Sequence, residues 1–305
     1  MSPAGTKIAV EGRELTLSNL DKVLYPEAGF TKGQVIAYYR AVAGVLLPHL
    51  AGRPLTLKRY PNGVEAESFY EKRCPSHRPD WVEVAPIWSR HNRAEVAYCV
   101  AGDLPTLVWV ANLASLELHT SLSRAGDIAR PTMVVFDLDP GAPATIVECC
   151  RVALRLKDLL GRMGLESLAK TSGSKGLQLY APLNTPATYE GGTKDFALAL
   201  AQLFEQRFPA EVVSSMRKDL RSGKVLIDWS QNDEHKTTVC VYSLRARPLP
   251  TVSTPVTWEE VARTADSADP GLLVFQAQDV VDRVNRLGDL FAPLNELEQT
   301  LPELG

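Results

Sequence analysis

The hydrophobic pattern of the chain changes character near residue 130. Before it, one amphipathic helix is followed by short β-rich stretches. Thr31 and Gln34 form a capping box that opens this helix, and apolar residues recur at helical spacing through Leu46. We predict strands at 54–60, 67–72, 82–88 and 95–100, a PNG turn at 61–63 that joins the first two, and a helix at 105–116 capped by Asp103.

Beyond residue 130, predicted strands alternate with predicted helices. This alternation favours a sheet whose polar loops gather at one edge. Further helices are expected to open at Thr257 and near Leu272. The predicted elements are a strand at 132–139, a helix at 145–163, strands at 167–171 and 177–183, a helix at 193–208 and a strand at 224–229.

Composition places the chain among globular proteins. Its 305 residues are 45% apolar and 23% charged, and the sequence has neither a long apolar run nor the features of a signal peptide. We therefore expect a cytoplasmic protein without membrane partners. The net charge of −3 gives no basic excess, although local clusters such as Lys58-Arg59 could follow a phosphate backbone or could be solubilising charges.

Five cysteines are present, and none forms a CxxC pair. The odd number and irregular spacing predict reduced thiols rather than disulfides, and no redox chemistry. Cys74 and His77, with His91 and Cys99 downstream, offer a weak zinc-site pattern, because the spacing is long and irregular.

The segment FDLDP sets Asp137 and Asp139 two residues apart at the end of an apolar strand, so both side chains face the same side. Two neighbouring carboxylates repel each other unless a cation or a proton lies between them, which predicts a Mg²⁺ or Mn²⁺ site. Asp228, at the polar end of the strand in VLIDW, could join them. Three such carboxylates around two cations are typical of phosphoryl or nucleotidyl transfer, although a single strand-end aspartate is more often a turn cap.

The turn SGSKG at 172–176 lies between two predicted strands. Its glycines and serines could direct several backbone N–H groups toward a triphosphate, and Lys175 adds a cation. A Walker A loop is excluded, since a strand rather than a helix follows. Alone, such a turn is weak support for phosphate binding.

These segments together resemble the polymerase domain of bacterial ligase D and its stand-alone relatives in the archaeo-eukaryotic primase superfamily. The matching blocks, in the expected order, are NLDKVLYP, GRPLTLKRYPNGV with FYEKRCP, FDLDP, TSGSKGLQLYAPL, and GKVLIDWSQN followed by KTT and YSLRAR. The resemblance implies an α/β (α+β) fold, with a primase-type catalytic core of mixed sheets flanked by helices and an N-terminal α/β module.

The same resemblance implies a DNA-dependent nucleotidyltransferase that fills gaps or extends broken ends in DNA repair, either gap filling or non-homologous end joining. Two Mn²⁺ or Mg²⁺ ions and NTP or dNTP substrates are implied, with a preference for ribonucleotides. Expected partners are gapped or overhanging DNA with a downstream 5′-phosphate, and a DNA ligase and an end-binding protein acting in trans. We expect a nucleoid-associated monomer, and a stand-alone enzyme with natural termini rather than an excised domain of a ligase D.

Site residues carry over position by position. Asp137, Asp139 and Asp228 match the metal-binding catalytic triad of the family. The family commonly has histidine where this chain has Gln178, which can still donate a neutral hydrogen bond but cannot become cationic. The other matches are nucleotide contacts (Ser172, Gly173, Lys175, Gln178, His119, Gln231, Arg245, Lys58), the 5′-phosphate pocket (Asn19, Lys22, Lys32) and template-stacking aromatics (Phe69, Tyr70).

The expected organisation is one polymerase domain in three parts. Residues 1–130 would carry the DNA contacts, 131–250 the triad and nucleotide loop, and 251–305 a helical segment packed on the core. Two alternatives remain open from the residues. One is a haloacid-dehalogenase-like phosphatase with Asp137 as nucleophile, although Pro140-Gly141 stands where that family has Gly-Thr. The other is a non-catalytic module that binds DNA ends.

Overall fold

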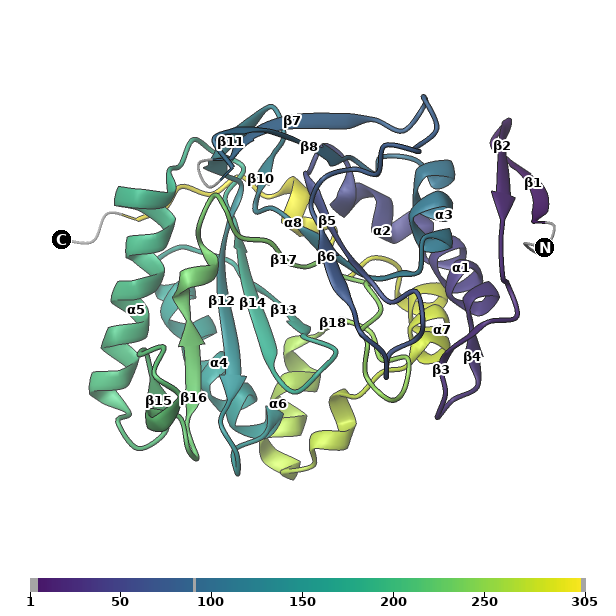
Figure 1. The fold of residues 1–305 in the computed structure, drawn as a ribbon. Helices are drawn as coiled ribbons and strands as arrows, with labels where there is room; N and C mark the ends of the chain where they lie inside the picture. The colour runs from purple at the N-terminus through teal and green to yellow at the C-terminus, as the bar shows by residue number, and fades with distance from the viewer. Residues whose placement is uncertain (1–4, 90–91, 303–305) are drawn as a thin grey trace. The chain divides into compact units, whose positions relative to one another are not determined.

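The computed structural model describes residues 5–89 and 92–302, which form two compact units (Figure 1). The first unit contains the chain up to Ser121 together with Val239–Val252 and Gln276–Asp289. The second unit contains Leu122–Thr238, Ser253–Phe275 and the chain from Leu290 onward. Each unit combines sheets with helices, so the predicted mixed α/β class is confirmed. The three-part division of the chain stays a prediction.

The first unit is built on a sheet with the strand order β17-β9-β5-β8-β7, and β6 pairs with β5. Two small hairpins, β1-β2 and β3-β4, complete its strands among the described residues. The strands are β1 (Thr6–Val10), β2 (Arg13–Leu17), β3 (Val23–Tyr25), β4 (Phe30–Thr31), β5 (Leu55–Arg59), β6 (Phe69–Glu71), β7 (Val84–Ser89), β8 (Ala94–Cys99), β9 (Ser115–Thr120) and β17 (Thr238–Val239, of which Val239 belongs to this unit). The helices are α1 (Lys32–Ala41), α2 (Ala43–Leu50), α3 (Leu104–Asn112) and α7 (Ala277–Leu287).

Capping residues set the helix starts of this unit as the sequence predicts. Thr31 and Gln34 form the capping box of α1, and the Asp103 carboxylate accepts a hydrogen bond from the Thr106 backbone N–H at 2.8 Å. The predicted first helix breaks at Val42 into α1 and α2. The predicted helix at 105–116 was too long: it ends at Asn112, Ala114 adopts a positive φ of 57°, and the buried strand β9 follows.

The second unit is built on a six-stranded sheet with the order β15-β16-β12-β14-β13-β18. Neighbouring strands are antiparallel except β15 and β16. The strands of the unit are β10 (Ser123–Arg124), β11 (Asp127–Pro131), β12 (Met133–Pro140), β13 (Leu168–Thr171), β14 (Leu177–Pro182), β15 (Val212–Val213), β16 (Val225–Asp228) and β18 (Pro255–Val256), and the helices are α4 (Ile146–Arg162), α5 (Lys194–Arg207), α6 (Trp258–Ser267) and α8 (Pro293–Glu296).

Helical predictions for this unit hold at both ends of α4, where Thr145 and Glu148 form a capping box. Thr257 caps α6 in the same way. The helix expected near Leu272 is instead a short 3-10 turn at Pro270–Leu273, and the following helix, α7, begins at Ala277 in the first unit. Within the described residues, no helix is both long and apolar enough to span a membrane.

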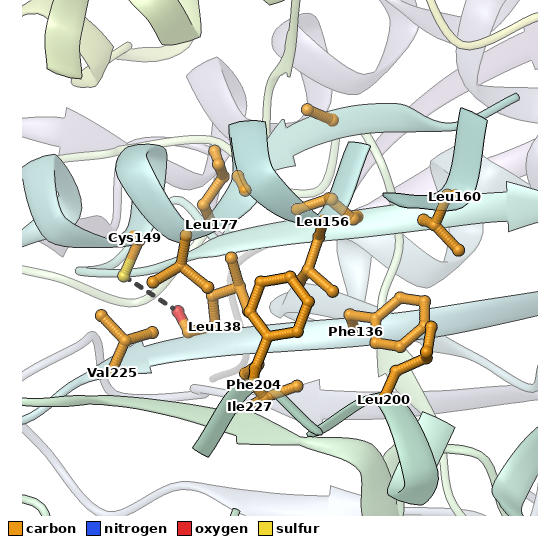
Figure 2. Packing of buried hydrophobic residues seen from close by; sticks show 14 of the residues in the cluster. Phe136, Leu138, Cys149, Leu156, Leu160, Leu177, Leu200, Phe204, Val225 and Ile227 are labelled. Atoms are coloured by element: carbon orange, nitrogen blue, oxygen red, sulfur yellow. Dashed lines mark hydrogen bonds between the residues drawn. The ribbon is translucent and has the colours of Figure 1, made fainter. Parts of the chain in front are cut away.

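One face of the six-stranded sheet packs against α4 and α5 (Figure 2). Phe136 and Leu138 from β12 meet Ile227 from β16 in this core, and all three are fully buried. The Cys149 thiol on α4 donates to the Leu138 carbonyl at 3.4 Å. Because side chains alternate along a strand, the core positions 136 and 138 direct Asp137 and Asp139 to the opposite face.

A side chain closes part of the β12 edge. β16 pairs with β12 only from Asp137 to Pro140. Beyond that point, the fully buried Asn232 donates to the Val135 carbonyl at 2.7 Å and accepts from the Val135 N–H at 2.9 Å. This amide therefore satisfies the two backbone groups that a longer β16 would have paired.

Candidate active site

Asp137 and Asp228 are directly opposite each other in the antiparallel register of β12 and β16. Such pairs share one face of the sheet, so Asp228 joins Asp137 and Asp139 on the face away from the core. Burial, together with the charges of Asp139 and Asp228, raises the pKa of Asp137 to about 7. The three carboxylates are therefore close enough to repel one another.

The carboxylate of Asp228 is oriented by the 3-10 turn that follows it, at Trp229–Gln231. Its Oδ1 accepts from the backbone N–H and the hydroxyl of Ser230, at 3.0 and 2.6 Å. Its Oδ2 accepts from the Gln231 side chain at 2.9 Å. Gln231, a predicted nucleotide contact, thus lies against a predicted metal ligand.

The donor set of this face suits a hard divalent cation, because carboxylate oxygens are the ligands that Mg²⁺ and Mn²⁺ prefer. A cation would also relieve the repulsion that raises the pKa of Asp137. In the described part of the chain, no three His, Cys, Asp or Glu side chains are already arranged to hold an ion. The residues fit a divalent ion by the chemistry of their oxygen ligands.

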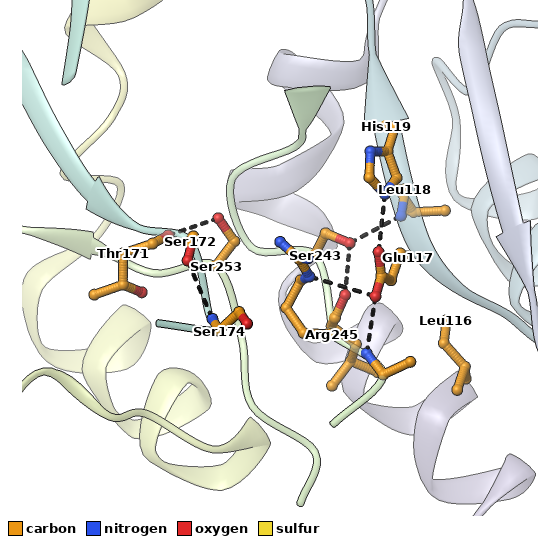
Figure 3. Close-up of polar contacts among 12 residues, drawn as sticks. Leu116, Glu117, Leu118, His119, Thr171, Ser172, Ser174, Ser243, Arg245 and Ser253 are labelled. Carbon is orange, nitrogen blue, oxygen red and sulfur yellow. Dashed lines mark hydrogen bonds and ion pairs between the residues drawn. The ribbon is translucent and has the colours of Figure 1, made fainter. Parts of the chain in front are cut away.

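The loop SGSKG connects β13 to β14 and is held by the Ser172 hydroxyl. This oxygen accepts from the Ser174 N–H at 3.2 Å (Figure 3). It also accepts from the Gly176 N–H at 3.1 Å. Gly173 has a positive φ of 66°, which suits glycine. At Gly176, a Cβ would collide with the Leu138 carbonyl, so glycine is what allows the loop to approach the aspartate-bearing strand.

Gln178 and Lys175 extend this site along the sheet. Gln178 on β14 is directly opposite Asp137 in register, is buried, and makes a hydrogen bond that lowers the pKa of Asp137. Lys175 reaches the Pro140 carbonyl at 3.4 Å. The second unit therefore brings together the three aspartates, the loop, Gln178 and Gln231.

In the first unit, a second polar cluster surrounds Glu117 on β9 (Figure 3). His119 lies 2.9 Å from the Glu117 carboxylate, the Arg245 guanidinium lies 3.4 Å away, and the Ala246 N–H donates to it at 3.1 Å. Lys58 on β5 is paired with Glu117 in register. The predicted nucleotide contacts His119, Arg245 and Lys58 thus gather around one buried carboxylate.

The charge state of this cluster follows from burial. Burial alone would raise the pKa of Glu117, but the His119 hydrogen bond and the Arg245 charge outweigh it and lower that pKa to about 2. Burial lowers the pKa of His119, and Glu117 only partly offsets this effect. At neutral pH we therefore describe the pair as a neutral imidazole that donates from Nε2–H to an ionised carboxylate.

A pocket of about 640 Å³ in the first unit is lined by Asn19, Lys22 and Lys32, the three predicted 5′-phosphate contacts. Lys32 is buried, and its Nζ donates to the Ser18 carbonyl at 2.7 Å. Burial, together with the charges of Lys22 and Arg59, lowers the pKa of Lys32 to about 8. A pocket in which cations repel one another is suited to an anion.

The two predicted template-stacking residues are exposed on β6, Phe69 by 44% and Tyr70 by 59%. The Arg59 guanidinium lies 5.2 Å from the Phe69 ring centre, and Lys58 lies at the same distance from the Tyr70 ring. Tyr70 also contacts the His119 ring edge-on at 5.7 Å. Large aromatic rings that are both exposed and backed by cations are suited to stacking with bases.

Comparison with known proteins decides the family. A family model described as "LigD, primase-polymerase domain" matches residues 31–291. This chain belongs to that family. It is 45% identical to the multifunctional non-homologous end joining protein LigD of Mycolicibacterium smegmatis over 92% of the chain, and 35% identical to the bifunctional LigD of Bacillus subtilis over 90%.

The chain spans 36% and 43% of the lengths of these two LigD proteins. Among solved structures, it is similar to the polymerase domain of Mycobacterium tuberculosis ligase D in complex with DNA, with a TM-score of 0.86 and 41% identity. That match covers 93% of this chain and 99% of the solved one. The resemblance to the ligase D polymerase domain and the predicted fold are therefore confirmed.

The prediction of reduced thiols is wrong for two cysteines of this LigD primase-polymerase chain. Cys74 and Cys99 form a disulfide, whereas the irregular spacing predicted reduced thiols. The two cysteines are 25 residues apart in sequence and meet only because the segment after β6 returns to β8, where the Cys74 N–H donates to the Ala97 carbonyl. The weak zinc pattern fails for the same reason, and its His91 lies outside the described residues. The other three cysteines are free and buried.

Two buried residues of the sites were not identified from the sequence. Glu117 directly follows the segment predicted as a helix at 105–116, where no strand was predicted, so its place beside His119 was not expected. Lys170 lies on β13 and is 1% exposed, with its Nζ 2.5 Å from Gln178 Oε1. A lysine two residues before the SGSKG loop was a usable signal, because strand alternation places Lys170 on the opposite face of the sheet from the core residue Ala169.

Proposed function

We propose that the chain is a DNA-dependent nucleotidyltransferase that fills short gaps or extends broken DNA ends. The observation that carries this proposal is the opposition of Asp137 and Asp228 across β12 and β16, with Asp139 on the same face. The SGSKG loop beside that face supports it, because Gly176 packs against the strand that bears the aspartates. The other LigD proteins act in non-homologous end joining by name, and we assign this chain to the same kind of repair.

Two Mn²⁺ or Mg²⁺ ions are the proposed cofactors, and when bound they would activate the primer hydroxyl and stabilise the leaving phosphate. Asp137, Asp139 and Asp228 are the proposed ligands. Backbone N–H groups and Lys175 in the SGSKG loop are proposed to hold the triphosphate, and Gln178 and Gln231 to contact the nucleotide. His119, Arg245 and Lys58 are proposed as further nucleotide contacts, on the strength of their clustering around Glu117.

DNA is the proposed polymer substrate. The pocket around Lys22 and Lys32 would take the downstream 5′-phosphate, and Phe69 and Tyr70 would stack on the template. A preference for ribonucleotides, action as a cytoplasmic monomer, and cooperation with a ligase and an end-binding protein are parts of the same proposal. The phosphatase alternative loses its basis, because the family match places the FDLDP motif in a primase-polymerase domain.

The test is primer extension on a gapped duplex with Mn²⁺, comparing NTPs with dNTPs. Asp139→Ala should abolish extension. Asp158→Ala, which removes an exposed carboxylate on α4, is the matched control and should extend like the wild type. Equal extension by wild type and Asp139→Ala would contradict the proposal. Hydrolysis of a phosphate monoester without extension would favour the phosphatase, and DNA binding without either activity would favour the non-catalytic module.

A further inference from the structure

A single row of side chains crosses the six-stranded sheet of the second unit. In register, Asp228 on β16 is opposite Asp137 on β12, Asp137 is opposite Gln178 on β14, and Gln178 is opposite Lys170 on β13. Residues directly opposite each other share one face of a sheet, so all four side chains lie on the face away from the core. The row places a lysine at one end and the carboxylates at the other.

Lys170 is 1% exposed, and a lysine is rarely buried without partners for its ammonium group. Its Nζ donates to Gln178 Oε1 at 2.5 Å and to the Ser253 hydroxyl at 2.7 Å. It also lies 5.3 Å from the centre of the Tyr180 ring. Ser253 is itself fixed, because its hydroxyl donates to the Thr171 carbonyl at 2.9 Å. The ammonium is therefore held in place from several sides.

This arrangement determines which way the Gln178 amide points. An ammonium group can only donate hydrogen bonds, so it selects the amide oxygen of Gln178. The Tyr180 hydroxyl lies 3.4 Å from the same oxygen and can also donate to it. The amide NH₂ is consequently left for the other side of the row, where Gln178 hydrogen-bonds with Asp137. A flipped amide would place two donors together at Lys170 and an oxygen against a carboxylate.

We propose that Lys170 is a positioning residue for the metal site: it fixes the Gln178 amide so that the NH₂ group holds the Asp137 carboxylate in its ligating orientation. This inference rests on the proposed function, since it takes Asp137 as a metal ligand. The lysine also places a positive charge behind three carboxylates, which lowers the cost of holding them on one face before a cation binds. Outer partners of this kind set metal affinity through the ligands they orient.

The experiment titrates Mn²⁺ into the full chain, without DNA or nucleotide, and follows free Mn²⁺ by electron paramagnetic resonance. Lys170→Met should weaken Mn²⁺ binding by about 10-fold or more. Lys157→Met is the matched control: Lys157 on α4 lies 5.1 Å from the centre of the Trp258 ring and is outside the row, so this variant should bind Mn²⁺ like the wild type. Unchanged Mn²⁺ affinity in Lys170→Met would overturn the inference.

A double-variant comparison separates positioning from a purely structural role. If Lys170 acts through Gln178, adding Lys170→Met to Gln178→Leu should cause no further loss of Mn²⁺ affinity. Losses that add independently would overturn the inference. Lys170→Met alone could leave Gln178 without its partner and fail to fold. The double variant then tests the inference by itself, because it replaces both partners with apolar groups. Wild-type Mn²⁺ affinity in the double variant would also overturn the inference.

The proposed function fails in a distinguishable way. If wild-type Mn²⁺ binding does not depend on Asp139, as judged with Asp139→Ala, the metal site itself is wrong and the role of Lys170 falls with it. If binding depends on Asp139 but not on Lys170, only the positioning role is rejected.

Discussion

Asp137 on β12 and Asp228 on β16 are paired directly opposite each other in the antiparallel register. Burial and the neighbouring carboxylates raise the pKa of Asp137 to about 7, so the folded protein retains a proton that the unfolded chain releases near pH 4. The unfolded state therefore binds fewer protons between these two values. It follows that Asp137 makes stability fall as pH rises from about 4 to about 7.

Asp137→Asn should remove this fall. Above about pH 8, the variant without metal should be more stable than the wild type by at least about 1 kcal/mol, because one repelling charge is gone. Mn²⁺ should stabilise the wild type more than the variant, since only the wild type keeps all three ligands. Urea unfolding with and without Mn²⁺ measures both effects. A variant without metal that is less stable than the wild type above pH 8 would be inconsistent with repulsion.

Gly176→Ala should disturb the nucleotide loop. Its Cβ would meet the Leu138 carbonyl, which is backbone and cannot move aside cheaply, so we expect a loss of about 1 to 3 kcal/mol in unfolding free energy and weaker triphosphate binding. Gly161→Ala on α4 is the matched control, because no atom lies within 4 Å of its added Cβ. That variant should gain about 0.5 kcal/mol. Equal stability of the two variants would show that the loop does not need its close approach.

The lowered pKa of Lys32 predicts that DNA binding depends on pH. Its pKa of about 8 means that it is charged at neutral pH and loses its proton as pH rises through that value. The preference for a 5′-phosphorylated gap over a 5′-hydroxyl gap should therefore fall about 10-fold between about pH 7 and pH 9. Fluorescence anisotropy with the two gapped duplexes measures this preference.

Lys32→Arg should abolish that fall, because arginine stays charged throughout this range. Lys7→Arg, an exposed substitution on β1, should retain the wild-type fall. A decline that persists unchanged in Lys32→Arg would assign it to another group.

The lowered pKa of Glu117 predicts that the folded protein loses stability in acid. Its pKa is about 2 in the folded protein and near the ordinary 4.5 when unfolded, so its contribution is complete above about pH 4.5 and is lost as pH falls toward 2. Glu117→Gln should cost roughly 3 kcal/mol at neutral pH and should make the acid limb shallower. Glu65→Gln, at an exposed position, is the control and should have little effect. Urea unfolding at neutral pH and at about pH 3 makes the comparison.

The elements that the sequence predicted best are those with local signals. The capping boxes at Thr31 and Thr145 and the alternation in FDLDP act within a few residues, so the start of α1 and both ends of α4 and β12 were placed close to their observed bounds. The hairpin assigned to the PNG turn is only partly right, since β5 and β6 do pair but through a longer connection.

Features that depend on long-range contacts were not accessible. β9 follows a helix without glycine or proline between them, and the turn relies on Ala114 in a left-handed conformation, which a sequence pattern does not predict. Strands of two residues, such as Val212–Val213, carry no periodicity at all. Strand alternation can indicate which face Lys170 occupies, but its buried hydrogen bonds depend on Gln178, on the next strand, and on Ser253, 83 residues away, so its partners could not be predicted.

Asn232 affects where β16 ends, and therefore where the Asp228 carboxylate lies. A strand edge with bare peptide groups invites another chain to add on, and a longer β16 would bury Asp228 within the ladder. By occupying the N–H and carbonyl of Val135, one amide lets β16 stop at its aspartate while β12 continues. The pairing of β16 with β12 thus stops partway along β12, and Asp228 is the last residue of the shorter strand.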